Sequence, residues 1–237
     1  MTVRNAMPFG DYVPPLRRVR WQPCVRIIPS RFPPVDLFQR VADPSDLERV
    51  HAIEALTNAR MRDDSGDMPL VPADDRVSGP GSEWIMAPFT HVFGPGGRFS
   101  TREFGAFYAA RTLATAVAET RYHREQFLRA TREPPMEIGM RALRTDLTAR
   151  LHDVRGESGR HPELYRSDEY AAPQTLASRL REGGSNGIVY DSVRYQGGQC
   201  VAILRPRTLS NCRQAEHLGY LWDGNEITSV YRKSLLE

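Results

Sequence analysis

The chain has 237 residues, of which 40% are hydrophobic and 26% are charged. This length suffices for one sizeable core but not for two ordinary domains, and the composition excludes wholesale disorder. The formal net charge of +3 is too small to indicate nucleic-acid binding, so we expect no direct contact with nucleic acid.

The first residues of the chain show neither helical nor strand periodicity. Residues 1–23 carry prolines among arginines and aromatic residues, which predicts an irregular N-terminal arm before a single domain over residues 24–237. The apolar run at residues 25–28 predicts a short strand that is closed by Pro29.

Periodicity predicts the remaining elements. Ser45 and Glu48 have the spacing of a capping box and predict a helix that ends near residues 58–62. Residues 63–82 are rich in Gly, Pro and Asp and predict a loop. Residues 112–128 lack Gly and Pro and have apolar residues at helical spacing, so they predict a helix. Short apolar runs predict one or two helices within 164–181 and strands over 84–90, 106–110, 136–143, 187–189, 199–204, 217–222 and 227–231. Helices and strands in mixed order, without regular βαβ alternation, predict an α+β fold.

The cysteines and the apolar runs indicate whether disulfides, a zinc site or a membrane segment are expected. Cys24, Cys200 and Cys212 are odd in number and lack CxxC pairing, which argues against a disulfide framework and a zinc site. We therefore expect no metal. The first residues lack the apolar stretch of a signal peptide, and no run approaches the roughly 20 apolar residues of a membrane-spanning helix. A cytoplasmic protein without membrane contact is the expectation.

Glu119, within the helix predicted over 112–128, is the first candidate for chemistry. An arginine, an aromatic ring and a carboxylate in one cleft would suit the pyrophosphate, the flat cationic ring and the ribose of a nicotinamide dinucleotide. Cleavage of the N-glycosidic bond to nicotinamide passes through an oxocarbenium-like state, which a fixed carboxylate stabilises while it binds a ribose hydroxyl. The alternative is a carboxylate that faces water beside the apolar stripe. His123, one turn later, either orients that carboxylate or covers the helix surface.

Two arginines and a tyrosine are the next candidates. Arg98 follows two glycines that allow close approach of a ligand, and a guanidinium suits a pyrophosphate; otherwise it is an arginine in a turn. Arg26 interrupts the apolar run at 25–28, and alternation places it opposite Val25 and Ile27, either exposed or in a polar cleft. Tyr108 lies in the middle of a predicted strand, where it either stacks on a ligand ring or belongs to the core.

Ser192 follows a Gly-Gly-Ser-Asn-Gly turn. Its hydroxyl either contacts a phosphate or a ribose, or it is an ordinary serine at a strand end. No GxSxG motif surrounds it, so nucleophilic serine catalysis is not favoured. The sequence also contains no P-loop and no GxGxxG motif, so it does not support a Walker-type or Rossmann nucleotide site.

The order and the surroundings of these residues resemble the RES-domain family, whose members are the toxins of RES–Xre toxin–antitoxin systems. The resemblance spans roughly residues 24–206. It rests on these segments: Arg-Ile-Ile-Pro-Ser at 26–30, Gly-Gly-Arg-Phe-Ser at 96–100, Ala-Phe-Tyr-Ala-Ala at 106–110, Ala-Val-Ala-Glu-Thr-Arg-Tyr-His at 116–123 and Tyr-Asp-Ser-Val at 190–193.

The resemblance implies mixed or antiparallel sheets flanked by helices, similar to ADP-ribosyltransferase toxins, and an enzyme that consumes NAD+. The acceptor would be water, phosphate or a protein, and a non-catalytic binding module of the same fold is the alternative. It also implies an Xre-type antitoxin partner that blocks the cleft, in complexes that commonly assemble as multimers. Matched by motif, the implied roles are phosphate binding by Arg26 and Arg98, stacking near the nicotinamide by Tyr108, catalysis by Glu119, and completion of the NAD+ pocket by Ser192 with His123 beside it.

Two positions depart from the family pattern. Ser100 stands where members often have Asn after the Gly-Gly-Arg-Phe run. Asp191 stands where a proline usually precedes the serine, and it is expected to add a negative charge near the phosphate pocket.

Overall fold

The computed structural model of the chain describes residues 12–30, 67–92 and 96–234. Its helices are α3 (Ser82–Thr90), α4 (Leu113–Thr131) and α5 (Ala171–Glu182), with five short 3₁₀ turns. Its strands are β1 (Leu16–Pro29), β2 (Phe107–Ala110), β3 (Met136–Asp153), β4 (Gly187–Asp191), β5 (Gln199–Ile203), β6 (Leu209–Trp222) and β7 (Ile227–Lys233). No helix in these ranges is long and apolar enough to cross a membrane.

The strands of the described part of the chain form one mixed sheet of seven strands, in the order β1-β2-β5-β4-β3-β6-β7. Strand β1 pairs with β3 as well as with β2, so five strands close into a ring from which β6 and β7 extend. The β3–β4 pair is parallel and the other pairs are antiparallel. The predicted α+β fold is confirmed.

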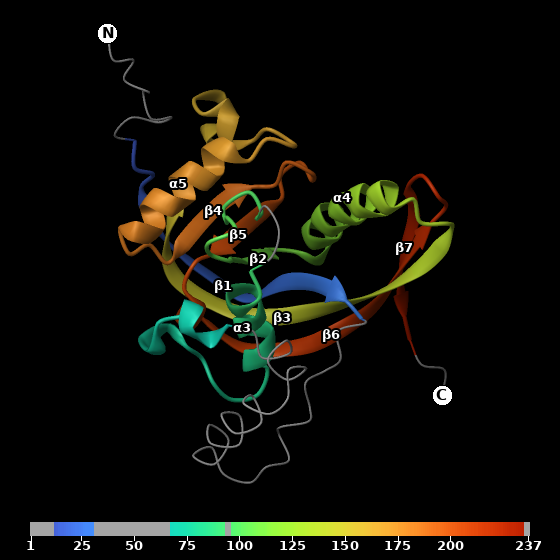
Figure 1. Cartoon of the computed structure of the whole chain (residues 1–237), viewed down its shortest axis with the longest axis horizontal. Helices are drawn as coiled ribbons and strands as arrows, with labels where there is room; N and C mark the ends of the chain where they lie inside the picture. The colour runs from blue at the N-terminus through green and yellow to red at the C-terminus, as the bar shows by residue number, and fades with distance from the viewer. Residues whose placement is uncertain (1–11, 31–66, 93–95, 235–237) are drawn as a thin grey trace.

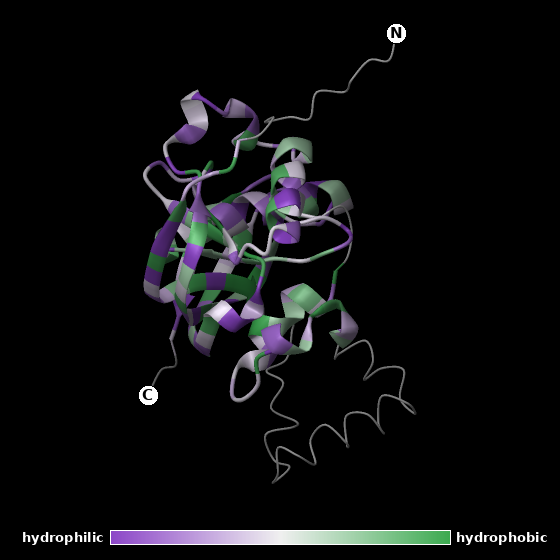
Figure 2. Ribbon diagram, turned by 90° about the vertical axis from the view of Figure 1, so that its left-hand side faces the viewer, coloured by the Kyte–Doolittle hydropathy of each residue, from purple (hydrophilic) through white to green (hydrophobic). Residues whose placement is uncertain are grey.

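Both faces of the sheet are buried. In β5, Cys200 and Ala202 belong to a core with α4 and α5, whereas Val201 and Ile203 belong to a second core with α3. Figure 1 shows α4 and α5 above β1, β3 and β6. Successive side chains of a strand point to opposite faces, so the strands supply both cores at once. Along the edges of the sheet, hydrophilic and hydrophobic residues alternate (Figure 2).

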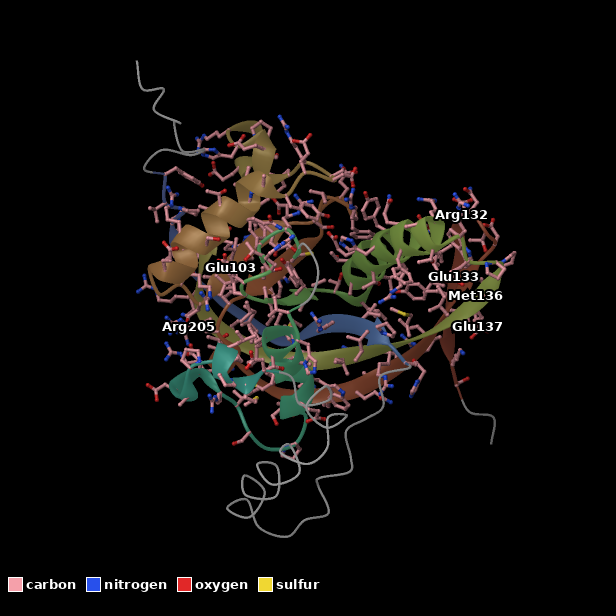
Figure 3. The ribbon with its side chains drawn as sticks, viewed as in Figure 1. Glu103, Arg132, Glu133, Met136, Glu137 and Arg205 are labelled. Carbon is pink, nitrogen blue, oxygen red and sulfur yellow. The ribbon has the colours of Figure 1, made fainter. Side chains whose placement is uncertain are left out.

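Helix α4 begins almost directly after β2, which brings the two elements of the predicted site together. Thr112 is the N-cap, and its Oγ1 accepts a hydrogen bond of 3.2 Å from the backbone N–H of Thr115. At the other end Arg132 adopts the left-handed conformation, with φ 54°, and its N–H bonds to Arg129. Pro134 and Pro135 follow and prevent continuation of the helix. Figure 3 labels Arg132 at this end of the helix.

The predicted irregular arm over residues 1–23 is wrong from Leu16 onward. Residues 16–23 belong to β1, and Leu16 to Trp21 pair with β3. Val19 and Trp21 are buried while Arg18 and Arg20 are exposed, so the segment does have the period of a half-buried strand. Pro23 lies at the irregularity between Trp21 and Cys24, where the register shifts. An edge position and a bulge are the places where a strand tolerates proline.

The strand predicted over residues 84–90 is also wrong, because this segment belongs to helix α3. Its buried residues Ile85, Met86 and Phe89 have helical spacing and pack in the second core. The predicted loop at 63–82 holds two 3₁₀ turns in its described part. The helix predicted from Ser45 lies outside the described residues. The other predicted strands and the helix over 112–128 are confirmed, although β3 and β6 are longer than predicted.

Candidate active site

One cavity of about 320 Å³ collects most of the predicted site residues. Arg26, Arg98, Tyr108, Glu119 and His123 all line it, from β1, the segment before β2, β2 itself and α4. The chain therefore brings together five of the six residues singled out from the sequence. The sixth, Ser192, reaches the cavity through its contact with Glu119.

Glu119 is held in place by Ser192. The Ser192 Oγ donates a hydrogen bond of 2.6 Å to Glu119 Oε1, and it accepts bonds of 3.1 and 3.0 Å from the backbone N–H groups of Arg194 and Tyr195. Because those two donors occupy the oxygen of Ser192, its proton is directed at the carboxylate. The Cys200 Sγ lies 3.8 Å from the same carboxylate oxygen. Ser192 therefore positions Glu119. The sequence analysis did not predict this contact.

Tyr108 is fixed against the loop that contains the two glycines. Its hydroxyl accepts a hydrogen bond of 2.8 Å from the Phe99 N–H and lies 3.1 Å from Ser100 Oγ. Gly97 covers the ring, since an added Cβ would lie 2.8 Å from the Tyr108 oxygen. Burial raises the pKa of Tyr108 to about 12, so the phenol stays protonated at neutral pH. The tyrosine presents a neutral ring to the cavity.

Arg98 is buried, with 7% of its surface exposed. Its Nη1 donates to the backbone oxygens of Leu164 and Arg166 at 2.8 and 2.9 Å, and its guanidinium lies 5.1 Å from the centre of the Tyr170 ring. No carboxylate of the described residues forms an ion pair with it. Carbonyl dipoles and a ring face thus hold a full positive charge beside the cavity, an arrangement that favours an anionic ligand.

Arg26 lines the cavity at the sheet, but its guanidinium lies on the opposite face of β1, toward the second core. As alternation predicted, it lies opposite Val25 and Ile27: its guanidinium is 4.9 Å from the centre of the Phe107 ring, and Nη1 donates to the Tyr108 backbone oxygen at 3.0 Å. Burial lowers the pKa of Arg26 to about 10, so it remains a cation at neutral pH. Within the described ranges it too lacks an ion pair.

His123 lies on α4 at the edge of the cavity, with its side chain partly in solvent. Desolvation by the surrounding atoms lowers the pKa of His123, while the nearby charge of Glu119 opposes that shift. The imidazole is therefore mainly neutral at neutral pH. As for metals, the described residues contain no group of three or more His, Cys, Asp or Glu side chains that could hold an ion.

The chain is similar to a known domain family and to known proteins. The model of the RES domain matches residues 74–223. The chain belongs to the RES-domain family. The uncharacterized protein y4oC of Sinorhizobium fredii (strain NBRC 101917 / NGR234) is 30% identical over 211 residues, which cover 87% of this chain and 85% of that protein. A crystal structure of the M. tuberculosis MbcT–MbcA toxin–antitoxin complex matches with 13% identity and a TM-score of 0.45, covering 84% of this chain and 86% of that chain.

The RES-domain match includes Arg98, Tyr108, Glu119 and Ser192, whereas Arg26 precedes it. The strand that carries Arg26 nevertheless pairs with β3 along its length and reaches the same cavity. Four of the predicted residues that line the cavity, Arg98, Tyr108, Glu119 and His123, therefore lie within the RES-domain match.

The two departures from the RES-domain pattern are accommodated locally. Ser100 Oγ accepts a hydrogen bond of 2.9 Å from the Gly97 N–H and contacts the Tyr108 hydroxyl, so it braces the glycine loop. Asp191 does not line the cavity: its Oδ2 accepts a hydrogen bond of 2.7 Å from the Gly156 N–H. The negative charge of Asp191 therefore lies outside the cavity lining, where it accepts a hydrogen bond from the turn after β3.

Sequence reasoning missed four residues that line the cavity of the RES domain, namely Tyr170, Tyr190, Arg194 and Cys200. Arg194 ends the Tyr-Asp-Ser-Val-Arg run, and its distance of two residues from Ser192 was a usable signal. Cys200 follows from the alternation of β5, given that Val201 belongs to the other core. Tyr170 precedes α5 in an irregular segment, where no sequence pattern marks it.

Proposed function

We propose that this RES-domain protein consumes NAD+ by cleaving the bond between nicotinamide and ribose, and that it acts as the growth-inhibiting toxin of a toxin–antitoxin pair. The observation that supports it best is the Ser192–Glu119 hydrogen bond of 2.6 Å in a cavity that also presents Tyr108 and Arg98. An oriented carboxylate, a neutral ring and the Arg98 guanidinium match the ribose, the nicotinamide and the pyrophosphate of NAD+.

The chemistry assigned to Glu119 is stabilisation of positive charge. As the bond between the ribose anomeric carbon and the nicotinamide nitrogen breaks, its electron pair neutralises the ring and an oxocarbenium-like centre develops on the ribose. Ser192 occupies Oε1 of Glu119, which leaves Oε2 to bind a ribose hydroxyl. The leaving group is already cationic, so no strong acid is required. This fits the raised pKa of Tyr108.

The acceptor of the ADP-ribosyl group completes the reaction. Water attack forms a bond to the anomeric carbon and releases one proton, and we assign its acceptance to His123, which lines the edge of the cavity. Phosphate or a protein side chain would take the place of water in phosphorolysis or ADP-ribosylation. We propose NAD+ degradation as the main activity, and Arg98 suits the substrate pyrophosphate whichever acceptor reacts.

The test is release of nicotinamide from NAD+ by the purified protein, with and without phosphate. Glu119→Gln keeps the shape of the side chain and is expected to slow release by about 10²–10³-fold, as loss of one stabilising group in other enzymes does. Glu103→Gln is the matched control, since Glu103 (Figure 3) is exposed and does not line the cavity. Wild-type protein that leaves NAD+ intact under both conditions would contradict the proposal.

Two further measurements identify the acceptor and distinguish an enzyme from a binding module. Labelled NAD+ in a cell lysate places label on protein only if a protein is the acceptor. A binding module would bind NAD+ in calorimetry without turnover.

The partner proposed for the toxin is an Xre-type antitoxin, as the family resemblance implies. Expression of the chain alone is expected to arrest growth and to deplete NAD+, and co-expression of a small helix-turn-helix protein encoded beside it is expected to restore both. Growth arrest that persists in Glu119→Gln cells would contradict toxicity through NAD+ loss.

A further inference from the structure

Arg194 connects two hollows of the molecule. It lines the cavity around Glu119, and it also lines an open groove of about 990 Å³ between α4 and β7. The walls of the groove are mainly apolar and include Leu113, Val117, Leu218 and Val230. A ligand anchored in the cavity that is too long for it can therefore extend past Arg194 into the groove.

The guanidinium of Arg194 is oriented but incompletely bonded. Its Nη2 donates to the Ser167 backbone oxygen at 2.7 Å, and its carbon lies 3.3 Å from the centre of the Tyr122 ring. Its Nε is buried and has no acceptor among the residues that the structure describes. The Arg194 side chain is only 11% exposed, and a buried N–H without an acceptor is costly unless a ligand supplies one.

The charge of Arg194 is also only weakly compensated. The nearest carboxylate is Asp168, whose Oδ1 lies 3.9 Å away and whose side chain is 72% exposed. Asp168 accepts a short hydrogen bond from the Tyr122 hydroxyl, which divides its charge between two partners. An exposed pair at this distance contributes little, so the cation retains most of its attraction for an anion.

The size of the two hollows indicates which part of a ligand each one takes. Pockets for ligands of moderate size have volumes of about 300–1,000 Å³, and the cavity is near the lower end of that range. A dinucleotide joins two nucleosides through a pyrophosphate and needs more room than this. The groove offers apolar walls together with the Tyr231 ring, surfaces against which a flat purine can pack.

We propose that Arg194 binds the pyrophosphate of NAD+ where the cavity opens into the groove, and that the groove binds the adenosine. This proposal rests on the proposed function. The nicotinamide–ribose half then occupies the cavity beside Glu119. The competing explanation is that Arg194 only fastens the segment around Ser167 to α4.

The test is equilibrium binding of two probes, ADP-ribose and nicotinamide mononucleotide, which measures the subsite without turnover. Arg194→Gln is expected to weaken ADP-ribose binding about 10–100-fold, the range for loss of a hydrogen bond to a charged group. Val230→Trp fills the groove and is expected to weaken ADP-ribose by a similar factor while changing nicotinamide mononucleotide binding less than about threefold.

Arg213→Gln is the matched control, because Arg213 lines neither hollow and forms an ion pair with Asp146. It is expected to leave both probes unaffected. Unchanged ADP-ribose binding in Arg194→Gln, or equal weakening of both probes by Val230→Trp, would overturn the proposal. If the wild type bound ADP-ribose in this pattern without consuming NAD+, the proposed function would fail and the subsite would stand.

Discussion

Replacement of Ser192 by alanine isolates the contact that positions Glu119. The change removes the donor of the 2.6 Å bond to Oε1 and leaves the carboxylate free to rotate about its side-chain torsions. It also removes the acceptor of the N–H groups of Arg194 and Tyr195. Arg194 is partly exposed and Tyr195 is exposed, so water can replace the serine oxygen there.

The expected loss falls on catalysis more than on stability. A hydrogen bond to a charged group contributes about 1.5–3 kcal/mol, which corresponds to about 10–100-fold in rate if the carboxylate must be fixed in the transition state. Misplacement of a reacting group by about 1 Å has a similar cost. The free energy of unfolding is expected to fall by less than about 1 kcal/mol, because the two freed N–H groups remain accessible to water.

A double-mutant cycle provides the assay. Single-turnover rates of NAD+ cleavage are compared for the wild type, Ser192→Ala, Glu119→Ala and the double variant, with the exposed β7 residue Ser229→Ala as control. If Ser192 acts only through Glu119, its loss has no further effect once Glu119 is absent. Equal effects of Ser192→Ala in both backgrounds would refute this reasoning and assign the serine a direct contact with NAD+.

Three further predictions concern the surroundings of the site. Gly97→Ala is expected to displace the Tyr108 ring and to lower the free energy of unfolding by about 1–3 kcal/mol, measured by urea denaturation; Gly159→Ala has open space and should be neutral. Asp191→Asn keeps an acceptor outside the cavity, so NAD+ cleavage should change less than about threefold, and a larger change would place its charge near the substrate. Burial lowers the pKa of His152 below its ordinary 6.5, so the unfolded chain binds more protons than the folded one and the free energy of unfolding should fall as pH decreases below that value. His152→Asn should reduce this fall, measured by urea denaturation at several pH values. An unchanged pH dependence in the variant would contradict the prediction.

Local sequence patterns predicted the strand that carries Tyr108 and the helix that carries Glu119, and both residues line the cavity. Both residues lie close to the junction of β2 and α4, and only Arg111 and Thr112 separate the two elements. Strand alternation also placed Arg26 on the correct face, because the period of a strand fixes side-chain direction. Such features depend on a few neighbouring residues, and the sequence contains them directly.

The contacts between distant segments could not be predicted in this way. Ser192 and Glu119 are 73 residues apart, and their contact depends on β4 and β5 pairing beside β2. The direction of the Asp191 side chain likewise depends on where the turn at Gly156 lies. The error at α3 has a local cause, since a short apolar run is compatible with both a strand and a buried helix.

The charges around the cavity give one further reason to favour NAD+ over other nucleotides. In the described part of the chain, Arg98, Arg194 and Glu119 are charged residues that line it, and Arg26 lines it with its guanidinium on the opposite face of β1. The cavity is thus cationic except at Glu119, while NAD+ has an anionic pyrophosphate and a cationic nicotinamide ring. A nucleotide without a positive ring would satisfy the arginines and leave Glu119 without a counter-charge. During bond cleavage the positive charge of the ring passes to the ribose, and it stays close to the same carboxylate. Glu119 therefore attracts the cationic ring of the bound substrate and then stabilises the positive charge of the transition state.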